Sequence, residues 1–259
     1  MDRAPETNHP VERGREGRVV WIRLNWPEQK NLLTPATVRA LLDALTEAAS
    51  SRETGAVLLL QKGDVFCGGI DYSSLADPAA RDGFSADLSR LFTILSGYAL
   101  PVVAAVHGAC AGGGVGLVAA CHLALAATGT KFGITDIHFG LWPFPFYAAL
   151  TAAVGPRRAR ELSLTGRAFS AADAQAYGLV HEVVPAFELE DRAFQVAGIL
   201  AGLSAEAVSA GLQFARSAAL ADAAAAFESA LETTDFAEGL AAHRQRRRPR
   251  WPSLERSRE

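Results

Sequence analysis

The chain has 259 residues, of which 49% are hydrophobic and 20% charged, and its formal net charge is −3. This balance predicts a globular protein with no general attraction to nucleic acid or to a membrane surface, and no apolar run reaches the ~18 residues needed to span a bilayer. The three cysteines, Cys67, Cys110 and Cys121, lack metal-ligand spacing. We therefore expect a reduced, cytoplasmic setting and no metal site.

Strand and helix patterns alternate through the first half of the chain. Residues 1–17 are polar and are predicted to form a loose leader. Strand patterns follow at 18–25, 56–61, 102–106 and 122–127. Helix patterns lie at about 34–50, at about 84–97 and after the glycines at 112–114, and Thr34 before Pro35 is a favourable helix start. The alternation predicts crossover connections and a mainly parallel sheet.

The second half is richer in alanine and in helix patterns. One of its helices has a capping-box start at Ser170, and a short strand is predicted at 179–184. The predicted helices span 156–165, 171–177, 187–202, 205–219 and 221–242. We predict an α/β body over residues 18–200 and a helical C-terminal portion over 201–259.

Two glycine turns follow two of the buried strand patterns. The run 56–61 leads to Gly68 and Gly69, and the run 102–106 leads to three consecutive glycines that begin at Gly112. No Lys-Ser or Lys-Thr follows them, so a phosphate-binding loop is absent. Two such turns can each aim one backbone N–H at the same carbonyl oxygen and stabilise its negative charge. Close packing of a helix explains a triple glycine equally well.

Six segments, in this order, resemble the motifs of the crotonase family of acyl-CoA enzymes (the enoyl-CoA hydratase/isomerase family). They are residues 24–31 (LNWPEQKN), 66–71 (FCGGID), 108–116 (GACAGGGVG), 131–136 (KFGITD), 164–180 and 235–247. The resemblance covers roughly residues 18–252. It implies a spiral of β-β-α units with C-terminal helices that mediate trimers, often paired as hexamers.

The resemblance also implies the groups that act on the thioester. The N–H groups of Ile70 and Gly113 would form the oxyanion hole, and the helix that begins at Gly113 would add its dipole. These donors stabilise an enolate, so that the α-carbon becomes acidic. Coenzyme A would be part of the substrate, and no separate cofactor is expected.

Contacts with coenzyme A follow from the same matching. The backbone of Gln29 and Lys30 would border the adenine, and Phe227 and Arg246 would contact the nucleotide, often from a neighbouring subunit. Trp142 belongs to a bulky aromatic run that would line a modest or planar, apolar acyl group. Ordinary packing explains Phe227 and Trp142 as well, and Arg246 lies in a basic cluster that a solvated tail would also explain.

The chain departs from the hydratases of this family, which use two glutamates to hold one water. The first of these positions is Gly116, and the second is Asp136. One carboxylate suffices to move a proton between two carbons, which is isomerase chemistry. It also suffices for hydration if another group orients the water. Candidates are His138, Thr135, Tyr72 and Ser73, although a structural role is favoured for His138.

We therefore expect an acyl-CoA enzyme that stabilises a thioester enolate. A hydratase-type lyase is narrowly favoured because hydratases are frequent in the family. An enoyl-CoA double-bond isomerase and a non-catalytic thioester-binding protein are the alternatives. The sequence leaves open the acyl group, the pathway, the choice of trimer or hexamer, and whether the carrier is coenzyme A or an acyl carrier protein.

Overall fold

The computed structural model describes residues 9–75, 78–217 and 232–255. Its larger sheet has six strands in the order β1-β2-β3-β5-β7-β10, and only β1 runs antiparallel to its neighbour. The strands are β1 Val11–Glu16, β2 Val19–Leu24, β3 Ala56–Gln61, β5 Val102–Val106, β7 Leu123–Ala127 and β10 Glu182–Val184. The prediction of a mainly parallel sheet is confirmed.

A second, smaller sheet lies beyond the ends of these strands. It has four strands of three residues each, in the order β4-β6-β8-β9. They are β4 Val65–Cys67, β6 Ala109–Ala111, β8 Lys131–Gly133 and β9 Ala168–Ser170. The chain passes from one sheet to the other as β3-β4, β5-β6 and β7-β8. Each step is followed by a helix, namely α2 Pro78–Ser96, α3 Gly113–Ala120 and α4 Tyr147–Thr165. These three β-β-α units confirm the predicted spiral.

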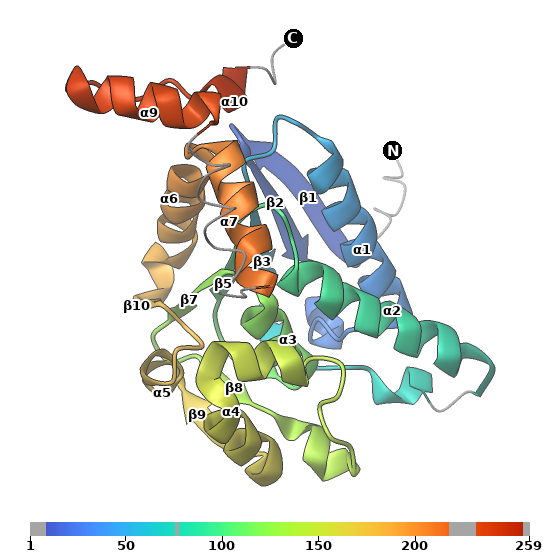
Figure 1. Cartoon of the computed structure of the whole chain (residues 1–259). Coiled ribbons are helices and arrows are strands. Elements are labelled where there is room, and N and C mark those ends of the chain that lie inside the picture. Colours follow the sequence, from blue (N-terminus) through green and yellow to red (C-terminus); the bar gives the residue numbers. More distant parts are fainter. Residues whose placement is uncertain (1–8, 76–77, 218–231, 256–259) are drawn as a thin grey trace, which may run out of the picture.

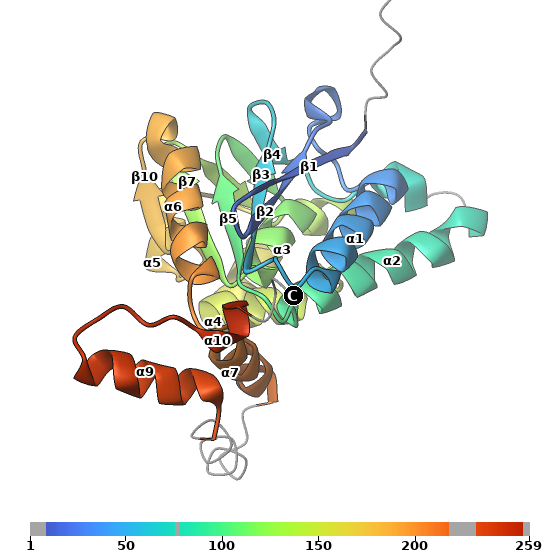
Figure 2. The ribbon, with the colours of Figure 1, turned by 90° about the horizontal axis from the view of Figure 1, so that it is seen from above.

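The larger sheet is covered on both faces, which explains why its central strands are apolar without alternation. Alternate residues of β3, such as Val57 and Leu59, pack with helices α1 (Pro35–Ser50), α2 and α3. Leu58 and Leu60 face helix α6 (Leu189–Ala201) on the opposite side. Figures 1 and 2 show the sheet between α6 on one side and α1 and α2 on the other.

The predicted loose leader is wrong for residues 11–16, which form strand β1. The sequence VERGRE is polar because β1 is an edge strand whose side chains are mostly exposed or half-buried. Its partner is Val19–Leu24, with Gly14 opposite Trp21. A Cβ atom at position 14 would lie 2.2 Å from the Trp21 ring, so glycine lets this ring cross the strand.

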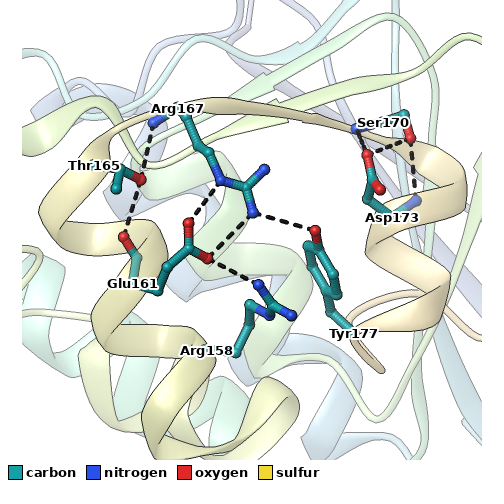
Figure 3. A network of polar contacts seen from close by, with 7 residues as sticks. All are labelled: Arg158, Glu161, Thr165, Arg167, Ser170, Asp173 and Tyr177. Atoms are coloured by element: carbon teal, nitrogen blue, oxygen red, sulfur yellow. Dashed lines mark hydrogen bonds and ion pairs between the residues drawn. The ribbon is translucent and has the colours of Figure 1, made fainter.

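The joint between α4 and α5 (Ala171–Ala176) is held by polar side chains (Figure 3). Arg167 donates two hydrogen bonds to Glu161 at 2.7 and 3.2 Å and a third to the Tyr177 hydroxyl at 3.2 Å. Ser170 and Asp173 form the predicted capping box at the start of α5. Thr34 likewise accepts a hydrogen bond from the amide of Thr37 at the start of α1, as predicted.

The C-terminal portion is helical where the structure describes it. It contains α7 (Ala205–Ser217), α9 (Thr234–Arg244) and the short α10 (Pro252–Glu255). Helices α9 and α10 lie at one end of the molecule next to α7 (Figure 2). The first part of the helix predicted at 221–242 lies outside the described residues.

No single helix in the described ranges is long and apolar enough to cross a membrane. The segments 186–201 and 205–215, which meet at a sharp bend, would be long and apolar enough together, by length and composition alone.

Candidate active site

Helix α3 begins at a turn that only glycine allows. Gly112 has φ 47° and ψ −117°, a backbone conformation that a side chain would strain. A Cβ atom at Gly114 would lie 2.7 Å from the carbonyl oxygen of Cys67, so α3 packs directly on strand β4. Close packing therefore accounts for part of the triple glycine, and the turn brings the start of α3 to the end of β4.

The two predicted oxyanion-hole residues meet at this point. A Cβ atom at Gly113 would lie 3.4 Å from the backbone nitrogen of Ile70. Leu33 and Ile70 form a parallel β-bridge. The Leu33 amide donates to the Gly69 carbonyl, and the Leu33 carbonyl accepts from the Asp71 amide. The N–H of Ile70 consequently points away from Leu33. Within the described part of the chain, neither this N–H nor that of Gly113 donates a hydrogen bond.

Asp136 lies against the same turn. It belongs to the 3₁₀ helix η3 (Thr135–Phe139), which follows strand β8, and only 1% of its surface is exposed. A Cβ atom at Gly112 would lie 3.1 Å from its Oδ2 and 3.6 Å from the Cα of Gly69. The absence of a side chain at Gly112 thus leaves room for the carboxyl group beside both glycine turns.

The two oxygens of Asp136 have different surroundings. The Tyr72 hydroxyl donates a hydrogen bond of 2.5 Å to Oδ1. Oδ2 is buried and has no hydrogen-bond partner among the described residues. A buried, unpaired carboxylate oxygen is costly and is uncommon without a functional reason.

The surroundings of Asp136 and Tyr72 raise the pKa of both side chains. Burial raises the pKa of Asp136, and the hydrogen bond from Tyr72 acts in the opposite direction. Burial and the neighbouring carboxylate raise the pKa of Tyr72, so its hydroxyl remains a proton donor. A carboxyl group whose pKa is raised toward neutrality is suited to both accepting and returning a proton.

Phe146 occupies the space where the first glutamate of a hydratase would begin. Gly116 lies in the first turn of α3, and a Cβ atom there would lie 2.5 Å from the Phe146 ring. Phe146 is fully buried, and its ring packs at 5.5 Å from that of Phe92. The loss of the acid at position 116 is therefore accompanied by an aromatic side chain that fills the vacated volume.

Of the four side chains considered as partners of Asp136, only Tyr72 bonds to it in the described structure. His138 turns its Nε2 toward the carbonyl of Gly166 at 3.4 Å, in keeping with the structural role favoured for it. The Ser73 hydroxyl donates to Asp71. Thr135 Oγ1 also lies near this turn, 3.7 Å from a Cβ atom placed at Gly112, but it forms no hydrogen bond with Asp136 among the described residues. No motif in the sequence distinguishes Tyr72 from the other three.

The residues expected to border the adenine are linked to the first glycine turn. Gln29 ends the 3₁₀ helix η1 (Pro27–Gln29), and the carbonyl of Lys30 accepts a hydrogen bond from Gly68 at 2.8 Å. Sequence reasoning assigned no role to the buried Asn31, which fixes this segment. Its side chain accepts from the Trp26 amide at 2.8 Å and donates to the carbonyls of Lys62 and Val65. Its presence in the matched segment 24–31 is the one signal that could have singled it out.

The remaining predicted contacts are not gathered at this turn. Trp142 is half-buried and packs on Tyr147 with ring centroids 5.2 Å apart. Arg246 is exposed beyond the end of α9, and no described contact joins it to Asp136. Phe227 lies outside the described residues. The described residues also contain no group of three or more His, Cys, Asp or Glu side chains that could hold a metal ion.

Comparisons with known proteins agree with this arrangement. The sequence model of the enoyl-CoA hydratase/isomerase family matches residues 14–254. A protein of Mycobacterium bovis named "Probable enoyl-CoA hydratase echA8" is 34% identical over 245 residues, which cover 92% of this chain and 95% of the relative. The crystal structure of an enoyl-CoA hydratase from Bacillus anthracis superposes with a TM-score of 0.88 at 29% identity, covering 94% of this chain and 99% of the other. An enoyl-CoA hydratase from Mycobacterium smegmatis gives a TM-score of 0.87 at 30% identity, covering 93% and 98% of the two chains. The chain belongs to the enoyl-CoA hydratase/isomerase family, within the crotonase superfamily.

Proposed function

We propose that this acyl-CoA enzyme is an enoyl-CoA isomerase that moves a proton between carbons 2 and 4 of its substrate. The observation that carries the proposal is a single buried carboxyl group, Asp136, with Phe146 in the space that a second acid would need. The sequence alone narrowly favoured hydration. The packing at Gly116 reverses this preference. The hydratases of the family hold a water between two carboxylates, and the second of these carboxylates has no counterpart here.

In the proposed reaction, Asp136 Oδ2 accepts the proton from carbon 2 of a 3-enoyl thioester. The electron pair of the broken C–H bond delocalises through the conjugated system onto the thioester oxygen. The N–H groups of Ile70 and Gly113 stabilise this dienolate, aided by the dipole of α3. Asp136 then returns the proton to carbon 4, the thioester carbonyl re-forms, and the double bond lies between carbons 2 and 3.

The unpaired oxygen supports this role for Asp136. Oδ2 lies beside Gly112, next to the residue whose amide would hold the thioester oxygen. We expect this one oxygen to serve carbons 2 and 4 in turn, because both lie on the same planar dienolate next to the thioester carbonyl. The remaining contacts, with the nucleotide at Gln29 and Lys30 and with Arg246 across a trimer, stay predictions from the family resemblance.

Hydration is the second candidate, and it is favoured by the names of the relatives in Mycobacterium bovis and Bacillus anthracis. It requires another group to orient the water. The Tyr72 hydroxyl is engaged with Asp136 Oδ1 and is the nearest such group in the described structure.

The test is to incubate the protein with 3-hexenoyl-CoA and, separately, with crotonyl-CoA in D₂O, and to follow the products by mass spectrometry. We expect conversion of 3-hexenoyl-CoA to the 2-enoyl isomer without addition of water. The Asp136→Asn variant should lose this activity by about 10²- to 10⁴-fold, because the base is removed. Asp43→Asn, which changes an exposed acid on α1, is the control and should retain it.

Addition of one water to crotonyl-CoA would instead make the protein a hydratase. Full turnover by Asp136→Asn would contradict the role of the carboxyl group in either reaction. Binding of coenzyme A with neither product would support the non-catalytic alternative.

A further inference from the structure

Tyr72 is held through its backbone and through one contact of its ring. It begins the 3₁₀ helix η2 (Tyr72–Leu75), only two residues after Ile70. The preceding Asp71 caps this helix, since its carboxylate accepts from the Ser73 amide at 3.1 Å and from the hydroxyls of Ser73 and Ser74 at 2.5 Å. The Tyr72 ring also packs against Phe139 of η3, with centroids 4.9 Å apart. The direction of its hydroxyl is therefore set by the backbone of η2 and by an aromatic contact.

This hydroxyl distinguishes two oxygens that are chemically equal. The terminal torsion of an aspartate is broad and two-fold, so a carboxyl group rotates readily unless a partner holds it. The hydrogen bond from Tyr72 holds Oδ1, and Oδ2 is consequently directed at the turn that contains Gly112. A fixed base has an advantage over a rotating one, because a small misplacement of reacting atoms costs a large factor in rate.

We propose that Tyr72 is a positioning residue whose hydroxyl holds the Asp136 carboxyl group in the orientation that directs Oδ2 at the reacting carbons. The inference rests on the proposed function of Asp136 as the base. It does not depend on whether the substrate is isomerised or hydrated, since both reactions require the same carboxyl group.

The elements around Asp136 leave Tyr72 as its principal electrostatic partner. The α3 turn contributes glycines, which have no side chains, and η2 contributes Tyr72. On η3 itself, His138 faces the Gly166 carbonyl. Among the described residues, no other titratable side chain acts on the pKa of Asp136. Removal of the Tyr72 hydroxyl therefore leaves burial, which raises this pKa, opposed only by the hydrogen bond from the backbone of Asp136 itself.

The experiment compares Tyr72→Phe with a matched control, Tyr98→Phe. Tyr98 is also a buried tyrosine, and its hydroxyl donates to the carbonyl of Leu45 at 2.5 Å, away from Asp136. A reaction that needs ionised Asp136 loses rate as the pH falls through the pKa of this group. In Tyr72→Phe we expect this acidic limb of kcat/KM to move up by about one to two pH units. We also expect kcat to fall by about 10- to 100-fold. Tyr98→Phe should leave the limb in place.

A second measurement follows the ionisation of Asp136 directly and does not depend on catalysis. Protein labelled with ¹³C at the aspartate carboxyl carbons is titrated by NMR, and Asp136→Asn identifies the resonance of Asp136. The resonance should titrate at higher pH in Tyr72→Phe than in the wild type or in Tyr98→Phe. An unchanged titration together with an unchanged acidic limb would overturn the positioning role, even if Asp136→Asn is inactive. If Asp136→Asn keeps its activity, the proposed function fails, while the NMR result still decides whether Tyr72 holds the carboxyl group.

Discussion

Gly116 and Phe146 illustrate how two residues thirty positions apart specify the chemistry of one site. Gly116 leaves a space beside the first turn of α3. The ring of Phe146, the residue directly before α4, fills this space. Because protein interiors are close-packed, a carboxylate cannot return to position 116 unless Phe146 moves. The proposed preference for isomerisation is therefore built into the core and does not depend on one missing acid alone.

This packing predicts the opposite of the usual effect of replacing a helical glycine. Alanine normally stabilises the interior of a helix by about 0.5–1 kcal/mol relative to glycine. Gly116→Ala should instead lower the free energy of unfolding by about 1–2 kcal/mol, because its Cβ atom would overlap the Phe146 ring. Urea denaturation measures the change. Gly198→Ala is the control, since position 198 in α6 has nothing within 4 Å of a Cβ atom, and it should be neutral or stabilising. A stabilised Gly116→Ala would show that Phe146 yields without cost.

The sequence predicted part of this site and could not have predicted the rest. Asp136 and the loss of the acid at Gly116 are visible because they lie in segments that match family motifs. Tyr72 was one of four candidates without a supporting motif, since contact with Asp136 depends on how η2 and η3 meet. Phe146 belongs to the same bulky aromatic run as Trp142, and the sequence pattern does not indicate its contact with Gly116. This contact depends on how the start of α4 packs on α3, which no single segment of the sequence shows.

At the scale of elements, the capping box of α5 is the local device that sequence pattern identified most directly. Ser170 Oγ accepts from the Asp173 amide at 3.1 Å, and the Asp173 carboxylate accepts from the Ser170 amide at 2.9 Å (Figure 3). Helix α5 is only six residues long, so its start depends strongly on these bonds.

Ser170→Ala should therefore lower the free energy of unfolding by about 1 kcal/mol, the typical cost of losing an N-cap side chain. Ser50→Ala is a matched control, because the Ser50 hydroxyl donates to the carbonyl of Glu47 at the end of α1 and caps no amide. Its effect should stay within about 0.5 kcal/mol. Chemical denaturation of both variants checks the difference, and equal effects would mean that the capping box contributes nothing beyond an ordinary surface hydroxyl.

The elements that sequence pattern missed are short or polar. The apolar runs at 56–61 and 102–106 were recognised because both faces of the larger sheet are buried. Strand β1 was missed because an edge strand needs no apolar pattern. The three-residue strands β4 and β6 carry too few residues to show a period, and they are defined by their pairing with each other and with β8.

At the scale of the whole molecule, the spiral is what assembles the site. Strands β4, β6 and β8 lie side by side in the smaller sheet, so the turns that follow them meet although they are far apart in sequence. Ile70, Gly113 and Asp136 each come from a different β-β-α unit. The glycine pattern suggested that the first two turns share one oxygen, but only the resemblance to a known family placed Asp136 beside them, because the order of strands in a sheet cannot be read from the periods of single segments.

Within the C-terminal portion, a buried carboxylate joins the three helices that the structure describes there. Asp235 at the start of α9 is 2% exposed and accepts hydrogen bonds from the Ser204 hydroxyl and from the amide and hydroxyl of Ser253. Ser204 precedes α7 and Ser253 lies in α10, so this single side chain joins three helices. If α9 and α10 mediate trimers, as the family resemblance implies, the same carboxylate supports the assembly.

Asp235→Ala should release α9 and α10 from α7, because it removes the acceptor of three hydrogen bonds, and the loss at the buried Ser204 hydroxyl alone costs about 1–3 kcal/mol. Trypsin should then cleave the arginine-rich segment 244–250 at least tenfold faster than in the wild type. Light scattering should show the wild type at about three times the 27.4-kDa chain, or six times for a hexamer, and the variant at a lower mass. Asp191→Ala, which removes an exposed acid from the first turn of α6, should change neither result. Faster cleavage with an unchanged mass would confirm Asp235 as the anchor and assign the subunit contacts to other elements, whereas unchanged cleavage would show that the anchor lies elsewhere.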